Sequence, residues 1–206
     1  MLSNKYKEVN RMLSKDSSNV SNNDVEHMSL SQLSADGHNV HMKGQIIDKI
    51  YKNGVLVDTV EGHNLVVNSF LKLAMALLKG QSGYNGIQYW AIGQGASSWD
   101  DNLPDPEINA TQLTSEIGRV AITASEIKFL NADFTESSTP TNILQIKHTF
   151  GANDCNGKWR EFCIFGGNAG STTNSGVMIN KRHHALITKT SDMTIERTMR
   201  FTLNLV

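Results

Sequence analysis

Apolar and polar residues alternate most regularly in the last stretch of the chain, Met193 to Val206. Up to Leu205 the odd-numbered positions are apolar and the even-numbered positions are polar, and only Arg197 interrupts the pattern. A period of two is typical of a β-strand with one buried face, so we expect a long antiparallel strand here. Since Arg197 falls on the apolar face, it requires a buried carboxylate partner, and the candidates for this structural ion pair are Glu116 and Glu161.

A second strong signal lies near the start of the β-rich region. Two runs with β-forming residues, Gln45–Tyr51 and Val55–Val60, flank the dipeptide Asn53-Gly54. This dipeptide predicts a tight hairpin, because a type I′ turn needs a positive φ at both central residues. Further strands are predicted at 87–92, 116–122, 126–129, 142–150, 159–165 and 177–188.

One segment, Asn68 to Gly80, has the pattern of a helix. Asn68 is suited to the N-cap and Gly80 to the position after the last turn, and apolar residues between them leave only one narrow polar stripe. A helix of this kind must be covered on most sides. We therefore predict a mainly β protein, an antiparallel β-sandwich of jelly-roll type with one buried helix at about residues 68–79.

The first part of the chain differs in composition from the rest. Residues 1 to about 36 are rich in Ser, Asn and charged residues, which disfavours independent folding. We predict an extended N-terminal docking arm at 1–43 and a β-sandwich domain at 44–206, with a flexible tail as the alternative for the arm. The arm's predicted partner-docking residues, on the apolar side of a short helix, are Tyr6, Val9, Met12 and Leu13.

Charge and composition narrow the classes of partner. The 206 residues carry a formal net charge of −1, so no overall basic field favours nucleic acid. The two cysteines, Cys155 and Cys163, do not form a disulfide framework, and a reducing cytoplasm is the expected site of synthesis. The start of the chain has no continuous apolar signal segment, and no apolar run is long enough for membrane insertion.

Candidate catalytic and metal-binding residues do not have the spacing that their chemistry needs. The acidic loop with Asp105 and Glu107 fits neither a glycosidase pair nor a calcium loop. The histidine pairs, His38 with His41 and His183 with His184, match no recurrent zinc spacing. No nucleophile elbow is present, and Gly93-Gln94-Gly95 does not lead into a helix, as a dinucleotide site would require. We expect no enzyme activity, no metal and no cofactor.

The same acidic loop offers a candidate glycan-binding site. Trp99 stands next to Asp100 and Asp101. An aromatic face can stack on a pyranose ring while neighbouring carboxylates accept hydrogen bonds from its hydroxyl groups. Trp99, Asp100 and Asp101 are therefore the residues expected to contact a host-surface glycan, if the protein binds one.

Several short segments, in a fixed order, carry a resemblance to a known class of proteins. They are NLVVN at 64–68, AIGQG at 91–95, SEIGR at 115–119, EFCIFGG at 161–167, GVMINK at 176–181 and TIERT at 194–198. From about Asn64 to Leu203 the chain resembles structural proteins of tailed bacteriophages and related contractile injection particles, which occur among tail, baseplate and fibre components. The class has no catalytic residues to transfer to this chain.

The resemblance implies a virion structural protein. Such a subunit would be made in the host bacterial cytoplasm and released by lysis, and it would be a homo-oligomer, for example a trimer. It would join a tail, baseplate or neck by docking its N-terminal arm onto neighbouring virion proteins. Two alternatives stay open: a receptor-binding module of a tail fibre that recognises host-surface glycan, and an enzyme that degrades cell-wall or capsule polymer.

Overall fold

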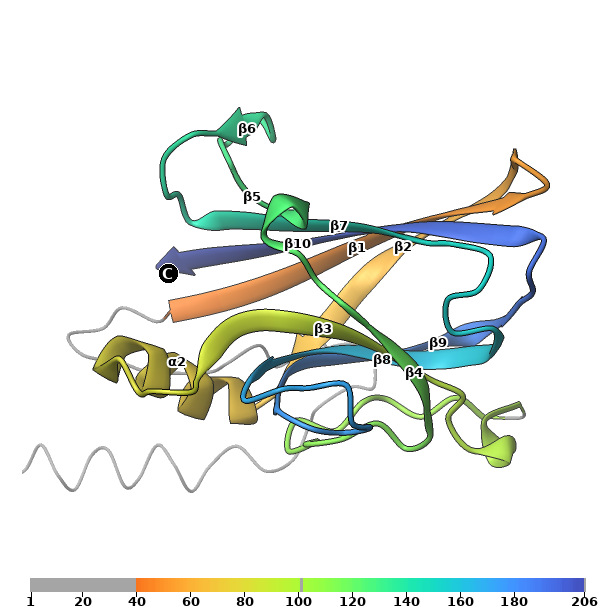
Figure 1. Ribbon diagram of the computed structural model, residues 1–206, viewed down its shortest axis with the longest axis horizontal. Helices are drawn as coiled ribbons and strands as arrows, with labels where there is room; N and C mark the ends of the chain where they lie inside the picture. The colour runs from red at the N-terminus through yellow and green to blue at the C-terminus, as the bar shows by residue number, and fades with distance from the viewer. Residues whose placement is uncertain (1–39, 101, 206) are drawn as a thin grey trace, which may run out of the picture.

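The protein is mainly antiparallel β-structure with one α-helix, as predicted (Figure 1). The computed structural model describes residues 40–100 and 102–205. Its strands are β1 (Val40–Lys52), β2 (Val55–Val66), β3 (Asn85–Gly93), β4 (Glu116–Ala121), β5 (Ile127–Leu130), β6 (Glu136–Ser137), β7 (Ile143–Phe150), β8 (Gly157–Gly167), β9 (Val177–Lys189) and β10 (Met193–Leu205). The helices are α2 (Ser69–Lys79) and two 3-10 turns, η1 (Ser97–Asp100) and η2 (Ala124–Glu126).

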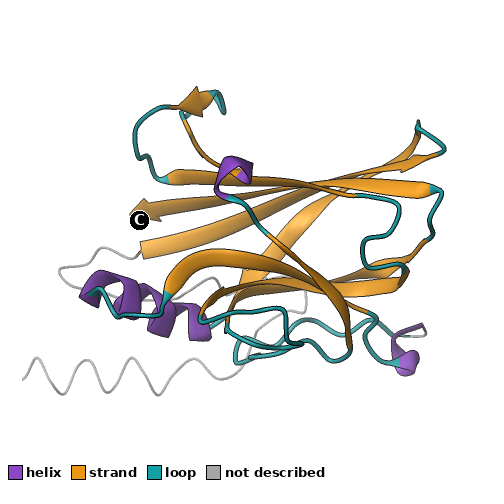
Figure 2. Ribbon diagram, viewed as in Figure 1, coloured by secondary structure: helices purple, strands orange, loops and turns teal. Residues whose placement is uncertain are grey.

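All ten strands belong to one sheet, in the order β4-β3-β8-β9-β2-β1-β10-β7-β5-β6. The sheet bends at β2, which pairs with β1 from Val55 to Asn64 but with β9 only at Leu65 and Val66. Figure 2 shows the result, in which the half with β1, β10 and β7 lies above the half with β3, β8 and β9. The two layers of the predicted sandwich are thus parts of one continuous open sheet.

The two strongest strand predictions are confirmed. Asn53 and Gly54 have φ angles of 49° and 79°, as a type I′ hairpin between β1 and β2 requires. β10 pairs with β1 on one side and β7 on the other, and its odd-numbered positions are buried from Ile195 to Phe201. Only the last two apolar positions, Leu203 and Leu205, are exposed.

The main core fills the space between the two layers. It combines side chains of β1, β7 and β10 with those of β3, β8 and β9. Its centre is aromatic, with Trp90, Phe150, Trp159 and Phe162 in edge contacts at centroid distances of 4.9–6.3 Å. Because side chains from both halves enter one cluster, the bent sheet folds as one unit.

A second, smaller core lies on the opposite face of β3, β8 and β9. It contains Cys163 and Phe165 of β8, and the long irregular loop after β3 covers it with Ala110 and Leu113. This explains why β8 is buried on both faces, as its continuous apolar sequence predicts.

The prediction of a helix buried on most sides is wrong. α2 has the expected bounds and ends at Gly80, whose φ of 67° is left-handed, but Leu73 is its only fully buried residue. Met75 and Leu78 are 65% and 81% exposed. The physical reason is that the loop after β3, and not the helix, covers much of the outer face of the sheet. α2 packs mainly on β9 and, to a smaller extent, on β3.

The start of β1 also changes the predicted domain boundary. β1 begins at Val40, so the last residues of the arm predicted at 1–43 belong to the sheet. The predicted docking residues Tyr6, Val9, Met12 and Leu13 lie outside the described residues.

The one-sided packing of α2 predicts unequal effects of truncating its leucines. Leu73→Ala should lower the free energy of unfolding by about 2–4 kcal/mol, because it removes a buried side chain and leaves a cavity. The matched variant Leu78→Ala should stay within about 0.5 kcal/mol of the wild type, because Leu78 is exposed. Urea unfolding followed by circular dichroism measures both. Equal losses at the two positions would contradict the orientation of α2.

Candidate docking surface

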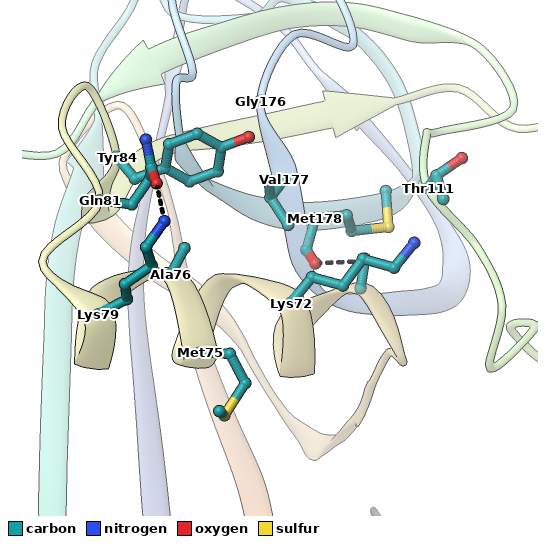
Figure 3. A pocket seen from close by; sticks show the side chains of 11 residues that line it. Lys72, Met75, Ala76, Lys79, Gln81, Tyr84, Thr111, Gly176, Val177 and Met178 are labelled. Carbon is teal, nitrogen blue, oxygen red and sulfur yellow. Dashed lines mark hydrogen bonds between the residues drawn. The ribbon is translucent and has the colours of Figure 1, made fainter.

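A groove runs along the exposed side of α2 and has a volume of about 600 Å³ (Figure 3). One wall is the helix, with Lys72, Met75 and Lys79, and the other includes Val177 and Met178 at the start of β9. Tyr84, in the turn before β3, contributes to the wall near the end of the helix. The groove is therefore mainly apolar, with two lysines along the helix.

The local sequence fixes this groove at both ends of the helix. At the first turn, the Ser69 hydroxyl donates a hydrogen bond of 2.7 Å to the carbonyl oxygen of Met178, which ties α2 to β9. At the last turn, the N–H groups of Gly80 and Gln81 bond to the carbonyl oxygens of Leu77 and Ala76, which close the helix in a left-handed cap. The helix is thus held by its ends and by Leu73, and its outward residues are available for contact.

Three apolar residues of α2 are exposed: Met75, Leu77 and Leu78. Of these, only Met75 lines the groove, together with Tyr84 just beyond the helix. An exposed apolar groove on a domain surface commonly marks a binding surface for another protein segment. A second exposed apolar group, Val55, Leu56 and Val57, lies at the tip of the β1–β2 hairpin.

The long loop after β3, which holds the candidate glycan residues, is anchored by a buried carboxylate. Glu161 on β8 accepts hydrogen bonds from the backbone N–H groups of Gly95, Thr114 and Ser115, at 3.3, 3.1 and 2.9 Å. Lys181 on β9 forms an ion pair with the same carboxylate at 3.3 Å. Both ends of the loop are therefore fixed to the centre of the lower layer.

Trp99 lies in this loop and packs against the sheet. Its ring is partly buried and its centroid is 4.2 Å from that of His183. His183 Nδ1 lies 2.7 Å from the carbonyl oxygen of Pro104, which adds a contact between loop and sheet. The side chain of Asp100 and all of Asp101 lie outside the described residues. The glycan site at Trp99 stays a prediction, and the observed contacts give Trp99 a structural role.

Glu116 anchors the second loop, between β8 and β9. Its carboxylate forms a bidentate pair with Arg119, at 2.6 and 2.8 Å, and accepts a hydrogen bond from the N–H of Asn174. Arg119 Nη1 donates to the carbonyl oxygens of Gly170 and Ser175. Glu116 and Glu161 are thus both used to hold loops.

The predicted partners of Arg197 are therefore wrong, because the structure pairs Arg197 with Asp48. Asp48 on β1 lies directly opposite Arg197 on β10, and two hydrogen bonds of 2.7 Å join their side chains. Arg197 is fully buried, and its guanidinium carbon lies 3.9 Å from the centroid of the Phe162 ring. Arg197 Nη1 has no hydrogen-bond partner among the described residues. The attraction between the guanidinium cation and the ring quadrupole offsets the cost of this missing hydrogen bond.

A histidine next to this pair is held neutral. His184 on β9 is buried, and burial, together with the positive charge of Arg197, lowers its pKa to about 4. Its Nδ1 lies 2.8 Å from the carbonyl oxygen of Ala185. A second cation in this part of the core would be unfavourable, so the neutral form of His184 fits the site.

A further polar pair, which the sequence pattern did not predict, lies in the upper layer, at β7. His148 Nδ1 is 2.5 Å from Glu126 Oε1, beside a hollow of about 440 Å³. Burial alone would raise the pKa of Glu126, but hydrogen bonds from the N–H of Thr123 and from His148 lower it. The carboxylate also closes the capping box of η2. The pair joins η2 to β7 and has a structural role.

The described residues include no cluster of three or more His, Cys, Asp or Glu side chains that could hold a metal ion. His38, one of the histidines considered for zinc, lies outside them. Within the described part of the chain, no helix is both long and apolar enough to span a membrane.

Comparisons with known proteins give no relative of this chain: no family model, no curated protein and no solved structure matches it.

The buried ion pair predicts a clear difference between removing one of its partners and removing a partly exposed charge on the same strand as Arg197. Asp48→Asn should cost about 3–5 kcal/mol of unfolding free energy, because it leaves the buried guanidinium without its counter-charge. Glu196→Gln, which breaks the partly exposed pair of Glu196 on β10 with Lys147 on β7, should cost less than about 1 kcal/mol. Chemical denaturation measures both. A cost for Asp48→Asn as small as that for Glu196→Gln would show that the pair does not stabilise the core.

The low pKa of His184 predicts that the free energy of unfolding depends on pH. Its pKa is lower in the folded protein than in the unfolded chain, so the unfolded state binds more protons between the two values, and stability rises with pH from about 4 to about 6.5. The loss on acidification through this window should be on the order of 3 kcal/mol. Urea unfolding at a series of pH values should therefore give a flatter profile for His184→Gln than for the wild type. Parallel profiles would exclude the shift.

Proposed function

We propose that the chain is a virion structural protein, an appendage or attachment subunit of a tail, baseplate or neck that docks through its N-terminal arm onto neighbouring particle proteins. The sequence resemblance to phage structural proteins suggests the class. The observation that carries the proposal is the position of β1, the strand to which the arm is connected.

β1 lies in the interior of the sheet. All of its residues, from Val40 to Lys52, are in register with β10, and from Gly44 onward it also pairs with β2. The pair Asp48–Arg197 adds a buried contact in the middle of the strand. A force applied to the arm would therefore act on the most extensively paired strand, which is what an anchored subunit requires, whereas an edge strand would peel off.

The surface of the body also suits a subunit that makes contacts with other proteins. Exposed apolar side chains gather on α2 and at the β1–β2 tip, at opposite ends of the molecule in Figure 1. The carboxylates of Glu161 on β8 and Glu116 on β4 hold backbone groups of the two main loops in place. These features favour a rigid module whose function is to bind and position, and they support a structural function over a catalytic one.

Deletion of residues 1–36 tests the proposal. The truncated chain should keep its β-rich circular dichroism spectrum and its cooperative unfolding, because β1 is complete without these residues. It should be lost from purified particles, since it lacks the arm. Quantitative mass spectrometry of particles from cells that express only the truncated chain measures its occupancy.

A matched pair of full-length variants separates the arm's apolar contacts from its length. Changing Tyr6, Val9, Met12 and Leu13 to Ser should reduce occupancy at least about tenfold, if these residues contact the partner. Changing four residues of the polar stretch 17–23 to Ala should not. Full occupancy of the truncated chain, or equal effects of the two substitutions, would overturn the proposal.

A further inference from the structure

We propose that residues 24–36 of the chain dock in cis in the groove along α2 and so cover Met75, the exposed apolar residue of the helix that lines this groove. The inference goes beyond the proposed function and does not depend on it, because it concerns the isolated chain. It rests on the shape and charge of the groove, on the sequence that precedes the sheet, and on the place where that sequence enters the fold.

The groove favours an acidic segment with apolar residues. Its apolar walls include Met75, Val177 and Met178, and the described residues that line it include two lysines, Lys72 and Lys79, and no carboxylate. Figure 3 shows these lysines on the helix, to either side of Met75. A segment that places apolar side chains on the walls and carboxylates beside the lysines would match both properties.

The sequence before β1 contains one segment of this kind. Residues 24–36, DVEHMSLSQLSAD, contain three acidic residues and no lysine or arginine, and their larger apolar residues are Val25, Met28, Leu30 and Leu33. The first fifteen residues are also partly apolar, but they carry four basic residues against one acidic residue. Repulsion from Lys72 and Lys79 would disfavour them in the groove, so charge selects residues 24–36.

The place where the chain enters the fold also favours this segment. In the β1–β2 ladder Gly44 lies opposite Asn64, so β1 starts at the end of the sheet from which β2 leads into α2. Figure 1 shows the start of β1 and α2 at the same end of the molecule. The seven steps from Leu33 to Val40 can span at most about 25 Å when extended, and α2 itself is about 16 Å long. Residues 24–36 can therefore reach the groove of their own chain.

The tether makes an intramolecular contact the favoured one. A short flexible connection gives an effective concentration of about millimolar. At micromolar protein, the segment of the same chain therefore competes successfully with that of a second copy, whose intrinsic affinity would be the same. Docking in cis would also leave residues 1–23, with the predicted contact residues, outside the groove.

Disulfide trapping in the full-length chain tests the inference. Leu30→Cys is combined with Met75→Cys in a chain that also carries Cys155→Ser; Cys163 is kept because it is fully buried. Two matched pairs serve as controls: Leu13→Cys with Met75→Cys, for the basic segment, and Leu30→Cys with Leu56→Cys, for the opposite end of the sheet.

The expected result is an intramolecular disulfide between positions 30 and 75. It should form at least about twentyfold faster than in either control, since the shorter tether of Leu30 relative to Leu13 explains only about fourfold. The rate should not change between about 1 and about 100 µM protein, as expected for a tethered contact. A rate no faster than the controls would overturn the inference, and so would faster trapping from position 13 or disulfide-linked dimers that increase with concentration.

Charge reversal tests the choice of segment independently. Lys72→Glu with Lys79→Glu should slow trapping between positions 30 and 75 about three- to tenfold at low salt, as expected for two exposed ion pairs. Adding Asp24→Lys and Glu26→Lys should restore the rate. The control Lys49→Glu with Lys158→Glu changes the net charge equally at exposed positions outside the groove and should have no effect. An unchanged rate after reversal at the groove would overturn the electrostatic selection. Because no particle is involved, these outcomes are independent of the assembly experiment.

Discussion

The buried pair of Arg197 and Asp48 is the interaction on which the rest of the structure depends. It joins the first and last strands of the described chain in the centre of the upper layer. Asp48 and Arg197 are 149 positions apart in the sequence. The guanidinium group also faces aromatic rings from the opposite layer, with Phe162 the nearest. A slip of one residue between β1 and β10 would turn Arg197 to the other face and leave Asp48 buried without a partner. The pair therefore fixes register and brings the two layers together at one point.

Buried charges hold the loops by the same principle. An irregular loop can be fixed on a sheet only if its backbone groups find partners, and a carboxylate can accept several N–H groups at once. Glu161 does this for the loop after β3, and Glu116 and Arg119 do it for the loop before β9. The result is a body in which even the long loops are tied to the central strands. Glu116 and Glu161 therefore fix the shape of the surface that these loops form.

The sequence predicted those features that depend on local geometry. The turn at Asn53-Gly54 follows from the φ angles that these two residues tolerate, and the burial of β10 follows from its alternation. The partner of Arg197 could not be predicted, because it depends on the register of two strands from opposite ends of the chain. Glu116 and Glu161 also lie in strands and are also buried or partly buried, so the sequence offered no reason to prefer Asp48.

The prediction that α2 is buried on most sides fails for a different physical reason. Its exposed side forms part of the candidate docking surface. Hydrophobic pattern reports which residues prefer to leave water, but it does not distinguish burial in the protein's own core from burial against another segment. Leu73 is buried in the protein's own core, whereas Met75 and Leu78 are not covered by any of the described elements. The segments before β1 differ in charge, basic in the first fifteen residues and acidic at 24–36, while the groove is basic. If the acidic segment occupies the groove, as proposed, the basic segment with the predicted contact residues stays outside it. The exposed side of α2 would then give the proposed docking arm a fixed origin.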